Sequence, residues 1–117
     1  MKKTLYGIPN CDTVKKARTW LADHQQPFDF HDFKKQGLAR ATVEGWLAQV
    51  DWETLVNRKG TTWRKLPDER RAGVLDAASA LTLMLEQPSV IKRPVLEHDG
   101  QVTVGFAPER YQTLFTK

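Results

Sequence analysis

The single cysteine of this 117-residue sequence is its strongest candidate for chemistry. Cys11 follows a short β-prone run at residues 4–8 and a Pro9-Asn10 turn, and it opens a segment whose apolar residues recur at helical spacing. At a helix start, unpaired backbone N–H groups and the helix dipole favour an anion, which holds a thiol as the nucleophilic thiolate. The same N–H groups can bind an oxyanion beside the sulfur. A buried, inert cysteine is the alternative, but the strand–turn–helix position favours a reactive thiol.

Polar residues beside Cys11 are candidates for supporting roles. Asn10 is a good helix N-cap, and Asp12 suits the positive end of the helix dipole. Together with Thr13, these residues form a polar first turn, which we expect to contact substrate or a bound anion. Lys15 follows Cys11 by one helical turn and is a candidate for stabilising the thiolate, although a lysine on an exposed helix face needs no function.

Two arginines are candidate anion-binding residues. Arg58 comes just after a helical stretch, and Arg93 lies between a helix and a strand. A guanidinium binds phosphate-like groups and carboxylates through two parallel hydrogen bonds, although each arginine could also be an ordinary surface charge. Arg93 precedes Pro94, and a proline that enters a strand from a loop is often near an active site, sometimes with a cis peptide bond.

The elements that must position these residues form three blocks. Residues 4–8, 11–21 and 28–33 predict a strand, a helix and a strand, which is a βαβ unit. Residues 34–88 predict an all-helical insertion, with helices at 41–50, 52–56, near 67–71 and at 77–85. Strand patterns return at 93–97 and 102–106 around Asp99-Gly100, a strong hairpin signal, and a helix follows at 109–115. We therefore expect an α/β fold with a four-stranded mixed sheet, in one domain over residues 1–117.

Composition and charge restrict the class of protein. Apolar residues make up 40% and charged residues 27%, as in soluble globular domains. No apolar run reaches the ~18 residues of a membrane helix, and the N-terminus has no signal-peptide pattern. A single cysteine cannot form an internal disulfide, which suits a reducing compartment. These features predict a cytoplasmic protein without membrane contact.

Metal, cofactor and nucleic-acid sites are not indicated by the residue patterns. His24, His31 and His98 have no ligand spacing with one another or with Cys11. The seven glycines form no phosphate-binding loop. The net charge of +4 comes from basic residues interspersed with acidic ones, so we expect a solvated surface and no direct nucleic-acid binding. We also expect a monomer.

These residues together resemble the arsenate reductase/Spx-like (ArsC-like) family, and within it the YffB-like subgroup. The resemblance covers essentially the whole chain in four ordered blocks. They are the cysteine segment at residues 6–17, a first arginine segment at 55–58 with 60–63, a second at 88–95, and Gly105-Phe106 with Glu109 and Tyr111. The resemblance implies a thioredoxin-like core with a helical insertion between its second and third strands.

The resemblance also assigns residues and shows two departures. It implies that Cys11 is the catalytic cysteine, that Arg58 and Arg93 bind an anion, and that Pro94 is a loop proline, commonly cis. Glutathione-coupled arsenate reductases have a third arginine before a C-terminal proline, where this chain has Ala107-Pro108, with Arg110 displaced from that position. Spx-type regulators often have a second cysteine three positions after the first, where this chain has Val14.

The sequence thus predicts a glutathione-dependent monothiol oxidoreductase. The Cys11 thiolate would form a mixed disulfide or an oxyanion adduct, and external glutathione would resolve it because the chain has no second cysteine. Glutathione is then a co-substrate, no cofactor is bound, and glutathione or a glutathionylated substrate is the expected partner. Two alternatives remain open. One is arsenate reduction, which the missing third arginine disfavours, and the other is an Spx-like regulator that binds a protein such as RNA polymerase.

Overall fold

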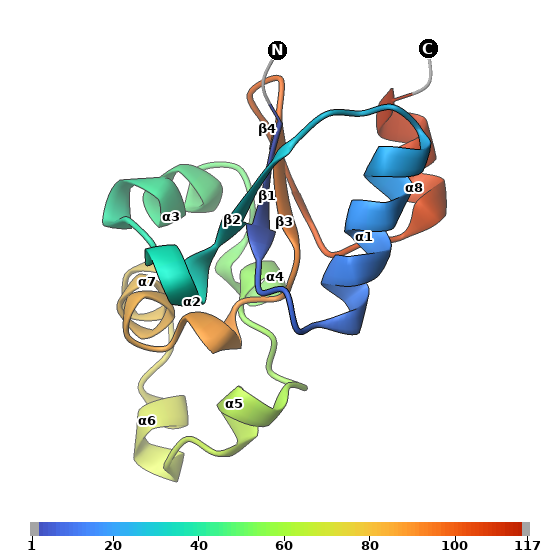
Figure 1. The fold of residues 1–117 in the computed structure, drawn as a ribbon. Helices are drawn as coiled ribbons and strands as arrows, with labels where there is room; N and C mark the ends of the chain where they lie inside the picture. Colours follow the sequence, from blue (N-terminus) through green and yellow to red (C-terminus); the bar gives the residue numbers. More distant parts are fainter. Residues whose placement is uncertain (1–2, 116–117) are drawn as a thin grey trace. The chain divides into compact units, whose positions relative to one another are not determined.

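A four-stranded sheet organises the first of two units that make up residues 3–115, the part of the chain that this computed structural model describes (Figure 1). The first unit contains residues 3–36 and 93–115, and the second contains residues 37–92. The second unit corresponds to the helical insertion predicted at residues 34–88. That the whole chain is a single domain stays a prediction.

The sheet of the first unit is mixed, as predicted. Its strands are β1 (Lys3–Gly7), β2 (Asp29–Asp32), β3 (Val95–His98) and β4 (Gln101–Val104). They lie in the order β2-β1-β3-β4, with β2 parallel to β1 and with β3 antiparallel to both β1 and β4. The helices α1 (Asp12–Asp23) and α8 (Pro108–Phe115) lie side by side on one face of the sheet (Figure 1). The short helix α2 (Phe33–Gln36) follows β2.

Packing in the core of this unit holds the start of α1 close to the end of β1. Helix α1 buries Val14, Ala17 and Leu21, three residues at helical spacing on one face. At the end of β1, a Cβ atom on Gly7 would lie 2.8 Å from Cγ2 of Val14, which is too close for any larger residue without a shift. Gly7 therefore lets the first turn of α1, and with it Cys11, approach the end of the strand.

The β3–β4 hairpin confirms the signal in the sequence. Its turn consists of Asp99 and Gly100, both with positive φ angles of 49° and 77°, and His98 pairs with Gln101 to close it. Two successive positive φ angles are characteristic of the type I′ turn, whose twist matches that of the strands.

Several strand boundaries differ from the prediction. Strand β2 ends at Asp32, and the next residue, Phe33, begins α2 as a buried core residue. Strand β3 begins at Val95 and not at residue 93, because the Arg93–Pro94 peptide is cis and lies before the ladder. Strand β4 ends at Val104, since Gly105 has a φ of 82° and its N–H donates to the carbonyl of Pro94 at 2.8 Å.

The second unit is helical around a small apolar core. Its helices are α3 (Arg40–Leu47), α4 (Trp52–Leu55), α5 (Thr61–Arg64), α6 (Asp68–Ala72), α7 (Ala77–Glu86) and the 3₁₀ turn η1 (Pro88–Val90). Trp46, Leu55 and Leu83 are completely buried in it. The sequence did not predict α5 or η1, which span four and three residues and are too short to show a helical apolar period. None of the helices within residues 3–115 is long and apolar enough to cross a membrane.

Candidate active site

Cys11 occupies the N-cap position of α1. Its backbone is extended (φ −134°, ψ 123°), its side chain is half-buried, and its carbonyl accepts the first helical hydrogen bond, from the N–H of Lys15 at 2.9 Å. An N-cap side chain is the one that normally accepts the N–H groups two and three positions into the helix, here Thr13 and Val14. The thiol of Cys11 makes no such hydrogen bond in the described part of the chain, but it lies at the positive end of the α1 dipole, which favours an anion.

The prediction that Asn10 caps the helix is wrong, because the helix begins one residue later than expected. Asn10 is an exposed turn residue, and the cap position belongs to Cys11 itself. Asp12, Thr13 and Lys15 are exposed in the first turns of α1, and no side-chain hydrogen bond or ion pair engages them within the part of the chain that is described. Their predicted contacts with a substrate or anion stay predictions.

Pro94 reaches the same end of the sheet as Cys11. Tyr6 pairs with Val95 in antiparallel register, so Pro94 comes beside Gly7, where the chain leaves β1 for Cys11. The Arg93–Pro94 peptide is cis, in agreement with the expectation from the sequence. Pro94 is buried and Arg93 is half-buried. The segments that carry Cys11, Pro94 and Arg93 thus adjoin the same end of the central strands β1 and β3.

Two further residues of this unit have side chains that are already engaged. The Tyr6 hydroxyl donates to Oε1 of Glu97 at 3.1 Å. Burial, reinforced by Glu97, raises the pKa of Tyr6 to about 12, so this phenol stays protonated and is no base for the thiol. Arg110, the only arginine near Ala107, donates from Nη1 to the carbonyl of Val104 at 3.0 Å. This hydrogen bond anchors the Arg110 side chain to the backbone at the end of β4.

Arg58 lies in the second unit, after α4. It is exposed, its Nη2 donates to Oε2 of Glu53 at 3.1 Å, and its guanidinium lies 5.7 Å from the centre of the Trp52 ring. It lines a cavity of about 330 Å³ together with Asn57, Lys59 and Lys92. The carboxylate of Glu53 also lines this cavity and pairs with Arg58. The charged side chains around the cavity are therefore three cations and one anion, and this net positive charge suits a carboxylate or phosphate-like group.

The sequence analysis missed Lys59 and Lys92. The signal was present, since each follows or precedes a candidate arginine directly, as Arg58-Lys59 and Lys92-Arg93. Within residues 3–115, no cluster of three or more His, Cys, Asp and Glu side chains could hold a metal ion.

The sheet order and the helices that pack on it define a thioredoxin-like fold, with Cys11 at the start of its first helix. The model of the ArsC family matches residues 6–114, and the chain belongs to that family. A solved structure named YFFB protein is 52% identical with a TM-score of 0.91, over 96% of this chain and 97% of that one. An arsenate reductase (ArsC) related protein from Brucella melitensis is 56% identical with a TM-score of 0.77, over 100% and 97%.

Two curated relatives extend the comparison. A protein of Haemophilus influenzae without an assigned function is 45% identical over 96% of this chain and 97% of its own length. The global transcriptional regulator Spx of Enterococcus faecalis is 27% identical over 88% of this chain and 78% of its own length. The predicted membership of the ArsC-like family, its YffB-like subgroup and its thioredoxin-like core are therefore confirmed.

Proposed function

We propose that this protein is a glutathione-dependent monothiol oxidoreductase that reduces glutathione mixed disulfides. The observation that carries the proposal is the position of Cys11, the only cysteine of the chain, at the N-cap of α1 beside the end of the sheet that holds cis-Pro94. Membership of a family that includes arsenate reductase-related proteins supports thiol-based reduction.

The reaction proceeds in two balanced exchanges. The Cys11 thiolate attacks the glutathione sulfur of a mixed disulfide, forms a Cys11–glutathione disulfide and releases the substrate as its thiolate. A second glutathione thiolate then attacks the glutathione sulfur of that disulfide, which releases Cys11 and oxidised glutathione. The backbone N–H groups of Thr13 and Val14 stabilise the thiolate before attack and after release, with Lys15 one turn away.

Arginines bind the carboxylates of glutathione in this proposal. Arg93 is held at the cis-proline edge, and Arg58, with Lys59 and Lys92, lines a cationic cavity. A charge-assisted hydrogen bond contributes about 1.5–3 kcal/mol. Each arginine therefore raises the affinity for glutathione without taking part in sulfur exchange.

The test is reduction of the mixed disulfide of glutathione and 2-mercaptoethanol, followed through formation of oxidised glutathione. Cys11→Ser is expected to lower the rate to the uncatalysed background, because the exchange needs the sulfur. The wild-type protein, sampled during turnover, is expected to show a glutathione adduct on Cys11 by mass spectrometry. Equal rates for the wild type and Cys11→Ser, or an absence of the adduct, would contradict the proposal.

Arsenate reduction is a less well supported candidate for the same site. The position of the third arginine is Ala107, and Arg110 is bound to the carbonyl of Val104. We expect no arsenate-dependent oxidation of glutathione in the same assay. Activity with arsenate comparable to that with the mixed disulfide would reverse this preference.

A regulator that binds a protein partner is the candidate from another class, and the similarity to Spx supports it. Affinity capture from lysate with the wild type and with Cys11→Ser distinguishes a protein-binding function from a catalytic one. A stoichiometric partner such as RNA polymerase, retained by Cys11→Ser, would favour binding as the function. Capture that depends on Cys11 and is reversed by glutathione would favour the oxidoreductase.

A further inference from the structure

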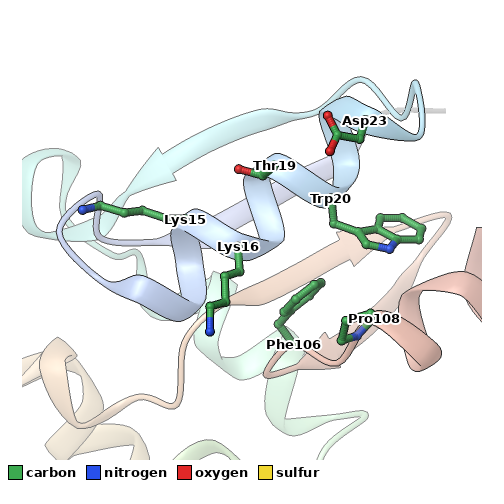
Figure 2. Close-up of a pocket in the computed structure, with 7 residues that line it drawn as sticks. All are labelled: Lys15, Lys16, Thr19, Trp20, Asp23, Phe106 and Pro108. Carbon is green, nitrogen blue, oxygen red and sulfur yellow. The ribbon is translucent and has the colours of Figure 1, made fainter.

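A groove on the first unit runs along α1 and is not used by the proposed exchange chemistry. It has a volume of about 400 Å³ and lies between α1 and the loop that joins β4 to α8. Figure 2 shows Trp20 from α1, Phe106 from the loop and Pro108 from the start of α8 gathered on one side of α1, with Lys16 beside them. We call these four residues the aromatic groove.

The walls of the aromatic groove are held rigidly from beneath. The fully buried ring of Tyr111 makes edge contacts with Trp20, at 5.5 Å between ring centres, and with Phe106, at 4.7 Å. The ring of His24 stacks on Trp20 at 3.8 Å and 13°. Trp20 and Phe106 are themselves only half-buried, so each keeps part of its ring open. Preorganised aromatic surface of this kind binds with little loss of side-chain entropy.

Charged side chains of opposite sign lie at the two ends of the groove along α1. Lys15 and Lys16 come first, and within the described residues neither forms an ion pair with a carboxylate. Asp23 lines the groove at the other end of the helix. The eight residues from Lys16 to Asp23 span about 10 Å of helix, which an extended peptide covers with about three residues. The complementary ligand has an acidic group near the lysines and a large apolar side chain beyond it.

The lysine end of the groove is also the end nearest the thiol. Lys15 and Lys16 follow Cys11 by little more than one helical turn, about 6–8 Å of helix. Cys11 itself does not line the groove. Measured along the helix axis, an extended chain that places a sulfur at Cys11 reaches the level of the lysines about two residues later and then the level of the aromatic groove.

We propose that the aromatic groove binds the segment of a partner protein that flanks its glutathionylated cysteine. That segment has an acidic residue about two positions from the cysteine and an aromatic or large aliphatic residue one or two positions further on. The inference rests on the proposed function and narrows its substrate class to protein mixed disulfides. In the step itself, Cys11 takes the glutathione sulfur and the partner protein leaves as its thiolate.

Two glutathionylated peptides of equal length test the proposal. One has glutamate and tryptophan at those positions, and the other has lysine and serine. We expect the wild type to reduce the glutamate–tryptophan peptide with a kcat/KM at least about tenfold higher, which corresponds to about 1.4 kcal/mol. Lys16→Glu is expected to abolish this preference and to leave reduction of the glutathione–mercaptoethanol disulfide unchanged. Lys34→Glu makes the same charge change on α2, outside the groove, and is expected to keep the preference.

The outcomes separate the groove from the chemistry. Equal kcat/KM values for the two peptides, with normal reduction of the glutathione–mercaptoethanol disulfide, would contradict the proposed peptide binding in the groove. They would not contradict the proposed oxidoreductase activity. If no disulfide is reduced, binding of the same peptides with serine in place of cysteine, followed by fluorescence anisotropy, still tests the groove. Equal affinity for both serine peptides would overturn it. A dimer in sedimentation that Lys16→Glu dissociates would assign the groove to a second copy of the chain and would also overturn the proposal.

Discussion

His98 is a buried histidine whose two ring nitrogens have no hydrogen-bond partner within residues 3–115. Its ring packs against Phe115 at 5.1 Å between ring centres. Burial lowers the pKa of His98 below its ordinary value, Lys3 adds to this effect, and Asp99 opposes it. The folded protein therefore holds His98 neutral, and protonation favours the unfolded chain.

The stability of the protein should depend on pH through this residue. The pKa is lower in the folded state, so the stabilisation is complete above the unfolded value of about 6.5 and is lost as the pH falls below it. We expect the free energy of unfolding to decrease between about pH 7.5 and pH 5, and His98→Leu to flatten that decrease. Urea denaturation of both proteins at each pH measures it, with His24→Leu, at an exposed site, as the control. Parallel pH profiles for the wild type and His98→Leu would refute this explanation.

Tyr111 gives a second prediction for a single residue. Its ring is fully buried in the core under Trp20 and Phe106, and its hydroxyl has no partner within the described residues. An unsatisfied buried polar group costs about 1–3 kcal/mol. Tyr111→Phe keeps the ring contacts and is expected to raise the free energy of unfolding by about 1 kcal/mol. Urea denaturation measures the change, and a clear loss of stability would show that the hydroxyl has a partner in solution.

The element that matters most for the site is the start of α1, and it depends on Gly7. A methyl group at this position would collide with Val14 at 2.8 Å, and overpacking of this kind costs about 1–3 kcal/mol. We expect Gly7→Ala to destabilise the protein by that amount and to slow the exchange reaction, because the collision displaces the turn that holds Cys11. Adding Val14→Ala should restore part of the activity, although it removes core volume. Additive losses of activity in the double variant would argue against the collision.

Elements that local residue types specify could be predicted from the sequence, whereas features that depend on contacts between distant residues could not. The strand–turn–helix around Cys11 and the Asp99-Gly100 hairpin follow from local residue types, and both were predicted. The exact cap was missed, because Asn10 and Cys11 are adjacent and only the tertiary position of the first turn decides between them. The aromatic groove was missed because Trp20 and Phe106 are far apart in sequence and ordinary core residues by type. The separation of the candidate anion-binding residues into two units likewise depends on long-range packing.

At the scale of the whole molecule, the candidate arginines belong to different units, with Arg93 in the first and Arg58 in the second. The proposed function assigns both to glutathione binding. Arg58→Ala and Arg93→Ala are each expected to raise the KM for glutathione by about tenfold, or about 1.4 kcal/mol. The double variant tests whether the two contributions are independent, because a loss smaller than the product of the two single losses indicates that the residues are coupled. Steady-state kinetics on the two single variants and the double variant measure this coupling. Arg40→Ala, on α3 of the second unit, is the matched control, because Arg40 also pairs with a glutamate but does not line the cavity. Fully multiplicative losses would mean that the two arginines act separately. An unchanged KM for glutathione in Arg58→Ala would mean that Arg58, and with it this part of the second unit, does not contribute to glutathione binding.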